Sequence, residues 1–243
     1  MRYKKDFTIH SYETNRFGKA SLSSVFNFLI EIAWEHAQKL DWGFDALRSN
    51  NLFWVLSRVF IQVEKYPEWQ EKVTVETWPT GTEGIYAFRE YAITNEQNEV
   101  IIRASSAWLI LDQESKRIIR PDSLTDNFRN FAQSKICRYP VKIKTNGRSE
   151  NLVFAPVNFT DLDVNQHFNS VKFVERALNS FEISFLSRNK VIEIEVNYLK
   201  EGLPQDSLAV SRVSVTENED IVSLIREADG VDLCTMKISW KAR

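Results

Sequence analysis

The spacing of apolar and polar positions predicts a long amphipathic helix near the start of the chain. Apolar residues in 21–40 recur at helical intervals, as Val25, Leu29 and Ile32 do. The residues able to cap its N-terminus are Ser21, Ser23 and Ser24. The preceding segment, residues 7–12, is expected to be extended.

Runs rich in Val, Ile, Trp and Tyr follow this helix and predict an antiparallel meander. The predicted strands are 53–64, 72–78, 86–94 and 100–111. Pro79, Gly81 and Gly84 separate the second strand from the third, and residues 95–98 separate the third from the fourth, as hairpin turns do. The first half is therefore predicted to be one helix packed on a sheet.

The second half repeats this order of elements. Its predicted elements are a strand at 152–159, a helix at 169–186 and strands at 191–199, 207–217, 221–228 and 231–241. One constant offset superposes Thr14 on Thr160 and Ser24 on Ser170. The predicted class is α+β, in which two helix-on-sheet halves join edge to edge into one continuous sheet. Because the aligned stretch is short, two unrelated α+β domains are the alternative.

The stretch from about residue 115 to residue 150 is predicted to connect the halves. It contains Pro121, Pro140 and Gly147 among charges of alternating sign. The predicted division is 1–125 for the N-terminal half, 126–149 for the linker and 150–243 for the C-terminal half.

Composition narrows the class of protein. With 243 residues and 43% hydrophobic content the chain can bury a large core, and its net charge of -2 gives no general attraction to nucleic acid or anionic membranes. No run of ~18 apolar residues suggests a membrane span. Cys137 and Cys234 are too few for a disulfide scaffold or a zinc site, so a reducing cytoplasm and no cofactor or metal are expected. The 7 Trp and 16 Phe are enough to line a cavity as well as a core.

The polar segment 160–170 is the strongest candidate for chemistry. If its centre is extended, alternation places Asp163, Asn165 and His167 on one face. They would lie beside the N-terminus of the helix begun by Asn169, whose free N–H groups can stabilise an oxyanion. A polar loop with capping residues and no chemistry is the alternative.

The internal repeat favours the chemical interpretation of this segment. The same offset places Phe17, Lys19 and Ser21 at the corresponding positions of the first half. The acid, amide and imidazole would then occur in one half alone.

Other titratable residues carry weaker signals. His10 in a predicted strand and His36 on the first helix are interpreted as structural or surface residues. Glu193 and Glu195 alternate with apolar residues, so they are expected on the exposed face of a strand. Glu201 ends that strand and is either a solvated turn residue or a second candidate carboxylate. Neither a nucleophile elbow nor a phosphate loop is present in the sequence.

Several separate motifs occur in an order shared with one family. They are DLDVNQHFN at 161–169, FWVLSR at 53–58, EKYP at 64–67, VETW at 75–78 and RASSAW at 103–108. On these motifs the sequence resembles the acyl-acyl carrier protein (acyl-ACP) thioesterases of plant plastids and bacteria. The resemblance spans nearly the whole chain.

The resemblance implies a double hot-dog fold, with the acyl chain received by the N-terminal half and catalysis in the C-terminal half. The family's catalytic residues fall on Asp163, Asn165, His167 and Glu201. Gly202 stands where the family has Cys, so a thiol role is not available there. The implied reaction is hydrolysis of fatty acyl-ACP in fatty acid biosynthesis, releasing free fatty acid and holo-ACP. Plant members carry a transit segment and this chain begins at the predicted core, so a bacterial cytoplasmic protein is expected.

Two mechanisms and two rival functions stay open. Glu201 or Asp163 acts with His167 to activate water while Asn165 orients it, or Asp163 attacks to form an anhydride. The rival functions are an acyl-CoA thioesterase of the same fold and a non-catalytic acyl-binding module. The implied partner is acyl carrier protein, and a homodimer through an outer sheet edge is favoured over a monomer. The apolar stripe of the first helix, with Ala33, either packs in the core or lines the acyl tunnel.

Overall fold

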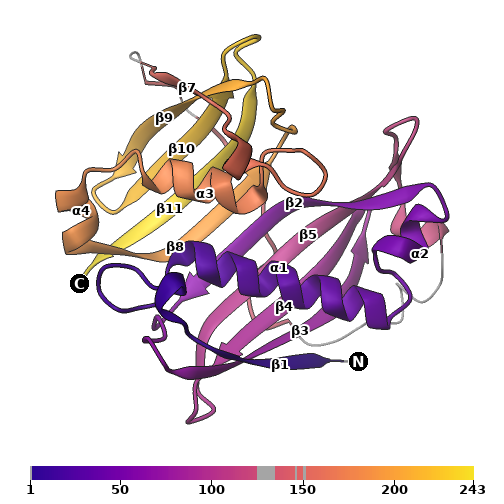
Figure 1. The fold of residues 1–243 in the computed structure, drawn as a ribbon, viewed down its shortest axis with the longest axis horizontal. Helices are drawn as coiled ribbons and strands as arrows, with labels where there is room; N and C mark the ends of the chain where they lie inside the picture. Colours follow the sequence, from indigo (N-terminus) through magenta and orange to yellow (C-terminus); the bar gives the residue numbers. More distant parts are fainter. Residues whose placement is uncertain (1, 125–134, 146, 150–151) are drawn as a thin grey trace. The chain divides into compact units, whose positions relative to one another are not determined.

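The computed structural model describes residues 2–124, 135–145, 147–149 and 152–243, and the chain divides into two compact units (Figure 1). The N-terminal unit is Met1–Pro140 and the C-terminal unit is Val141–Arg243. Both units place helices on one face of an antiparallel sheet, so the predicted α+β class is confirmed. None of the helices in the described ranges is long and apolar enough to span a membrane.

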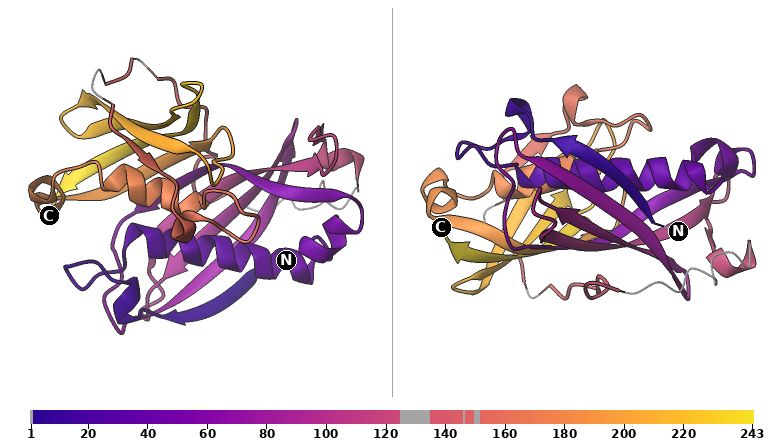
Figure 2. Two further views of the ribbon diagram at one scale, coloured as in Figure 1. Left: turned by 45° about the horizontal axis from the view of Figure 1, so that its top comes forward. Right: turned by 90° about the horizontal axis from the view of Figure 1, so that it is seen from below.

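The N-terminal unit lays one long helix across a sheet. Its elements are β1 (Tyr3–Thr8), η1 (Ser11–Glu13), α1 (Leu22–Lys39), α2 (Phe44–Arg48), β2 (Leu52–Val63), β3 (Lys72–Glu83), β4 (Tyr86–Thr94), β5 (Val100–Asp112), β6 (Ile118–Ile119) and η2 (Pro121–Ser123). The strands pair in the order β1-β3-β4-β5-β2, and β6 pairs with β5. Figure 2 shows α1 over one face of this sheet. Its apolar stripe is buried there, with Val25 and Ile32 fully covered.

The C-terminal unit repeats this arrangement with shorter helices. Its elements are β7 (Phe154–Pro156), η4 (Phe159–Asp161), α3 (Ser170–Leu178), α4 (Ile183–Arg188), β8 (Asn189–Tyr198), β9 (Ser207–Thr216), β10 (Glu219–Arg226) and β11 (Asp232–Ala242). The strands pair in the order β8-β11-β10-β9-β7, all antiparallel.

Helix α1 begins at one of the three predicted caps. Ser21 is the N-cap residue, because its hydroxyl accepts the Ser24 N–H at 3.1 Å. The Ser24 hydroxyl donates to the Glu13 carbonyl at 2.8 Å, which ties the helix start to η1. The predicted helix and the observed α1 agree closely at both ends.

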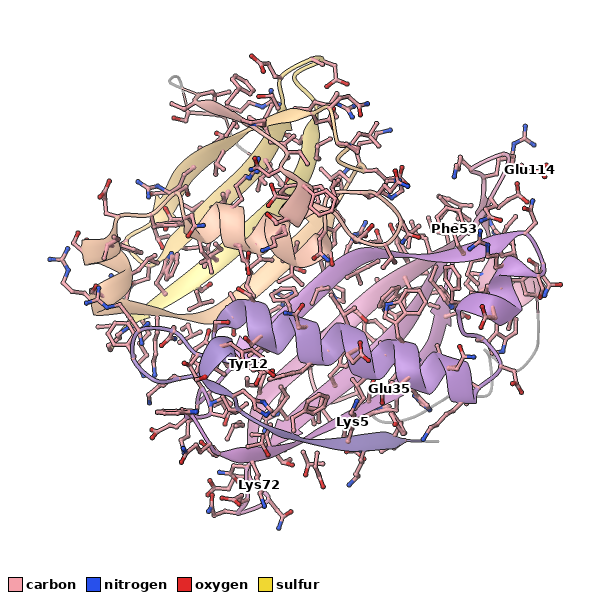
Figure 3. All side chains as sticks on the ribbon, viewed as in Figure 1. Lys5, Tyr12, Glu35, Phe53, Lys72 and Glu114 are labelled. Atoms are coloured by element: carbon pink, nitrogen blue, oxygen red, sulfur yellow. The ribbon has the colours of Figure 1, made fainter. Side chains whose placement is uncertain are left out.

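Polar contacts attach α1 to the edge strand β1. The Tyr3 hydroxyl donates to the Glu35 carboxylate at 2.8 Å, and Lys5 pairs with the same carboxylate, so that Lys5 and Glu35 face one another in Figure 3. The Tyr3 ring stacks on His36 with centroids 5.7 Å apart. These contacts fix the rotation of α1 and thereby hold His36 against the sheet.

The predicted helix at 169–186 is wrong as one element. It ends at Leu178 and resumes as α4, because Phe181 between them turns into the core. That ring is 6% exposed and packs edge-on against Trp240, with centroids 4.8 Å apart. The sequence also missed α2 and β6, which are too short to show a period.

The first predicted strand, 7–12, is also misplaced. Strand β1 starts earlier and ends at Thr8, and η1 follows it. The Glu13 carboxylate accepts the His10 N–H at 2.7 Å, which stabilises this turn of 3-10 helix. His10 is therefore an exposed cap residue, in line with its structural interpretation.

The described part of the predicted linker forms hydrogen bonds with strands of both units. Residues 125–134 lie outside the described residues. Glu90 on β4 accepts the N–H groups of Ile136 and Cys137 at 3.0 and 3.2 Å. Asn197 on β8 accepts the Ile143 N–H at 2.9 Å. Backbone groups that a free loop would leave to water are thus paired with buried side chains.

The predicted exposure of Glu195 is wrong, because the same connecting segment covers this side chain. Its side chain is 3% exposed and accepts the Val141 N–H. The alternation along β8 correctly indicated that Glu195 lies opposite the core residues Ile194 and Val196. The connecting segment covers that outer face, which the alternation does not reveal.

Candidate active site

The segment that carries Asp163, Asn165 and His167 is a tight turn. Leu162 and Phe168 form an isolated antiparallel bridge, and the Asp163 N–H donates to the His167 carbonyl at 2.9 Å. Gln166 at its tip has φ 62°, in the left-handed region. The prediction of an extended segment with alternating faces is therefore wrong.

The Asp163 side chain is the physical reason for the turn. Its Oδ1 accepts the N–H of Asn165 at 2.8 Å and that of His167 at 3.2 Å. An aspartate bonded to the backbone two residues later stabilises a turn, which competes with extended structure. Asn165 at the tip is exposed, and its side-chain amide makes no hydrogen bond within the described ranges.

The turn brings His167 beside Glu201, which lies far from it in sequence. His167 Nε2 is 3.5 Å from Glu201 Oε2, and the two side chains are 33% and 48% exposed. Backbone bonds fix this approach: the Phe168 N–H donates to the Gly202 carbonyl at 2.8 Å, and the Leu199 N–H donates to the Leu233 carbonyl at 2.8 Å. The imidazole and carboxylate are within ion-pair distance and open to solvent on one side.

The start of α3 lies directly after this turn. Asn169 is the N-cap residue, since its Oδ1 accepts the Val171 N–H at 2.8 Å. The Tyr198 hydroxyl donates to the Ser170 carbonyl at 3.0 Å and joins the helix start to β8. The predicted position of the candidate residues beside a helix N-terminus is thus observed. Within the described ranges no group of three His, Cys, Asp or Glu side chains is arranged to hold a metal ion.

Gly202 is required by close packing beneath this turn. A Cβ atom at Gly202 would lie 2.7 Å from the Phe168 Cβ and 3.4 Å from its Cγ. The Phe168 ring is 4% exposed and packs against Phe173 with centroids 4.6 Å apart. The bulk of Phe168 therefore explains why this position holds no larger side chain here.

Gly202→Ala is expected to lower both stability and activity. Relief of the Cβ contact must move Phe168, and with it His167, at a cost of about 1–3 kcal/mol in the free energy of unfolding. Urea unfolding measures the loss of stability, and turnover of the thioester that the family resemblance implies measures the loss of activity. Adding Phe168→Val should not restore either loss, because valine keeps the Cβ atom that the new methyl group contacts. Wild-type behaviour of the single variant would contradict this packing argument.

The same turn occurs in the N-terminal unit. Thr14 and Ala20 form the bridge, the Asn15 N–H donates to the Lys19 carbonyl at 2.8 Å, and Asn15 Oδ1 accepts the Phe17 N–H at 2.9 Å. Lys19 Nζ lies 3.5 Å from Glu68 Oε1. A basic side chain thus approaches a carboxylate in both units.

This second turn corrects the predicted offset of the repeat. The bridges and hydrogen bonds match Asn15 with Asp163, Phe17 with Asn165 and Lys19 with His167. The offset drawn from Thr14 and Thr160 is two residues short, because it followed residue identity and not the turn. The N-terminal turn keeps the geometry without the acid or the imidazole.

A pocket in the N-terminal unit is lined mainly by aromatic and small apolar side chains. The lining residues are Ala33, Trp34, Ala37, Leu40, Trp42, Trp54, Pro79, Gly81, Ala87, Phe88, Arg89 and Trp108. Of the predicted stripe on α1, Ala33 lines the pocket, whereas Val25, Leu29 and Ile32 pack in the core. The abundance of Trp was the available sequence signal, but composition does not say which residues converge.

One charged side chain, Arg89, lines this pocket. Its Nη1 donates to His36 Nδ1 at 2.9 Å and to Thr77 Oγ1 at 3.2 Å. Burial, reinforced by the Arg89 charge, lowers the pKa of His36 to about 3, so the imidazole is neutral at physiological pH. Because an arginine N–H only donates, Nδ1 is the acceptor and Nε2 carries the proton. The sequence missed Arg89, which has no motif around it.

In the part of the chain that the structure describes, two helix-on-sheet units and one His-Glu pair define a double hot-dog protein with one candidate site. Models of the acyl-ACP thioesterase N-terminal domain and C-terminal domain match residues 1–129 and 144–242. The chain belongs to the acyl-ACP thioesterase family.

Individual relatives agree with this assignment. An acyl-ACP hydrolase of Cuphea viscosissima is 28% identical over 99% of this chain, which spans 62% of that protein's length. An oleoyl-ACP thioesterase of Arabidopsis thaliana is 28% identical over 94% of the chain and 67% of its own. The crystal structure of an acyl-ACP thioesterase from Bacteroides thetaiotaomicron superposes with TM-score 0.89 at 22% identity, covering 99% of this chain and 98% of the other. The 12:0-ACP thioesterase from Umbellularia californica gives TM-score 0.84 at 21% identity, covering 100% and 98%.

Proposed function

We propose that this protein hydrolyses the thioester of fatty acyl-ACP, releasing free fatty acid and holo-ACP in fatty acid biosynthesis. The observation that carries the proposal is the approach of His167 Nε2 to Glu201 Oε2 at 3.5 Å in a member of this family. A histidine near a carboxylate is suited to moving a proton near neutral pH. The relatives that are acyl-ACP hydrolases and thioesterases support the choice of substrate.

In this proposal His167 and Glu201 take the proton from an attacking water. The exposed amide of Asn165 orients the water or the thioester, and the first N–H groups of α3 stabilise the oxyanion. Asp163 uses Oδ1 to hold two backbone N–H groups, which favours a positioning role over nucleophilic attack. The water route is therefore preferred to an anhydride.

The proposal places the acyl chain in the aromatic pocket of the N-terminal unit. Four tryptophans surround it: Trp34, Trp42, Trp54 and Trp108. Large aromatic surfaces gain free energy by covering methylene groups, by roughly 0.8 kcal/mol for each buried CH₂. Chain length would then be read by this unit and chemistry performed by the other.

Turnover of matched acyl-ACP and acyl-CoA thioesters tests the proposed function. We expect kcat/KM to be at least about tenfold higher for the carrier-protein substrate, because protein–protein contacts add binding free energy that CoA lacks. Equal or greater turnover of acyl-CoA would favour the acyl-CoA thioesterase. Acyl binding without turnover of either substrate would favour a non-catalytic module.

The oligomeric state and the cellular location are also part of the proposed function. We infer a homodimer joined through an outer sheet edge and a bacterial cytoplasmic location. Sedimentation at several protein concentrations tests the dimer, which a constant monomer mass would exclude. Fractionation of the source cells tests the location.

A further inference from the structure

No carboxylate side chain in the described ranges neutralises the charge of Arg89 in the pocket that it lines. Both of its hydrogen-bond partners are uncharged, because His36 is neutral and Thr77 is a hydroxyl. In the part of the chain that the structure describes, Arg89 forms no ion pair with a carboxylate. Burial lowers the pKa of its guanidinium, as desolvation of a cation does. The pocket therefore contains a partly desolvated positive charge without a counter-charge.

The guanidinium also has donors to spare. Its Nη1 makes the bonds to His36 and Thr77, which leaves the N–H groups of Nη2 and Nε without a bond in the described ranges. The surrounding protein does not seal these atoms in. The fully enclosed polar side-chain atoms that lack a partner there are His36 Nε2 and Glu90 Oε1, and neither belongs to Arg89. Free donors on a residue that lines the pocket are accessible to what occupies it.

A plain hydrocarbon chain would be a poor match for this part of the pocket. It would displace water from the cation and return no hydrogen bond, and an unpaired buried charge is costly. An oxygen on the chain would accept a charge-assisted hydrogen bond from the free N–H groups. The anchoring bonds to His36 and Thr77 hold the guanidinium in one position, so little further ordering is needed.

We propose that Arg89 is a specificity-determining residue that selects acyl chains bearing an oxygen function, a hydroxyl or a carboxylate, on the part of the chain distant from the thioester. This inference rests on the proposed function, which places the acyl chain in this pocket. The substrate class it defines is oxygenated fatty acyl thioesters. Unsubstituted chains long enough to reach Arg89 are poorer substrates.

A binding measurement tests Arg89 without requiring turnover. The tryptophans that line the pocket report occupancy by fluorescence, and neutral methyl esters avoid any charge from the head group. The ligands are methyl octanoate, decanoate, dodecanoate and tetradecanoate, each with its ω-hydroxy counterpart, so that the hydroxyl is presented at several depths. The monomethyl ester of dodecanedioic acid distinguishes a preference for carboxylate from one for hydroxyl.

We expect wild-type protein to bind at least one oxygenated ester about tenfold more tightly than its plain counterpart, the factor expected for a hydrogen bond to a charged group. Arg89→Met, which keeps a long side chain without the charge, should remove or reverse this preference. Arg89→Lys should retain part of it. A wild-type protein that prefers the plain ester at every length overturns the proposal, and this result needs no variant to fold. Equal preference in wild type and Arg89→Met also overturns it.

Turnover of the same chains on acyl carrier protein separates this inference from the proposed function. Binding preference without hydrolysis upholds the role of Arg89 and sinks the thioesterase proposal. Hydrolysis with no preference for oxygenated chains supports the thioesterase proposal and overturns the role of Arg89. Thermal unfolding of each variant checks that it is folded.

Discussion

Replacing His167 with alanine is expected to lower kcat/KM for acyl-ACP by about 10²- to 10⁴-fold, the usual contribution of a general acid–base group. In the proposed mechanism the imidazole links the attacking water to Glu201, whose Oε2 lies 3.5 Å from His167 Nε2. Alanine leaves the turn itself intact, because the bonds that close it use the backbone of His167 and the side chain of Asp163. Steady-state kinetics measure the loss, and thermal unfolding should be nearly unchanged.

The N-terminal unit provides a matched control for this variant. Lys19 occupies the corresponding position of the same turn and lies 3.5 Å from Glu68. Lys19→Ala removes a similar surface ion pair, worth about 0–1 kcal/mol, and should leave kcat/KM within about twofold of wild type. Glu201→Gln should reproduce most of the His167→Ala loss. An active His167→Ala, or equal losses in both turns, would place the catalytic site elsewhere.

His36→Gln is expected to reduce the sensitivity of the fold to acid. The folded-state pKa of His36 is lowered to about 3, whereas the unfolded residue titrates near 6.5. Between these values the unfolded state binds one more proton, so stability falls as pH falls, by about 1.4 kcal/mol per pH unit. Glutamine has no such titration and can still accept a hydrogen bond from Arg89. Wild type should therefore lose about 2.5 kcal/mol more than the variant between about pH 7 and pH 4.5.

Urea unfolding of both proteins across this pH range measures the difference. The exposed His10 and the half-exposed His167 are present in both proteins, so the comparison isolates His36. His10→Gln serves as a control for replacing an exposed histidine with glutamine. A constant difference between wild type and His36→Gln would show that the buried imidazole is not held neutral.

Much of the fold was predictable because it depends on periodic burial. The long apolar stripe of α1 and the alternation of the strands report which faces are buried, and both elements appear near their predicted positions. The residues proposed for catalysis also stood out, since acids, amides and an imidazole rarely cluster between apolar elements. Their grouping in one turn agrees with the expectation that they lie together.

The failed predictions concern contacts that no period encodes. Asp163 bends its own backbone, so the alternation expected around Asn165 does not apply. Glu195 is covered by a segment more than fifty residues away in sequence, through the N–H of Val141. The sequence around Arg89 does not distinguish it from the other arginines, and only the packing of the chain shows that it lines the pocket. The first depends on a local bond from side chain to backbone, and the other two depend on which distant residues pack together.

The paired turns have a consequence for how such a protein can change. Each turn is closed by a short polar side chain at its first position, Asp163 in one unit and Asn15 in the other, and by bonds between backbone atoms. The shape therefore does not depend on the side chains at the tip and at the end of the turn. After a duplication, those positions can accept new residues in one copy while the other preserves the reaction. Loss and gain of an active site then become a matter of a few substitutions within an unaltered scaffold.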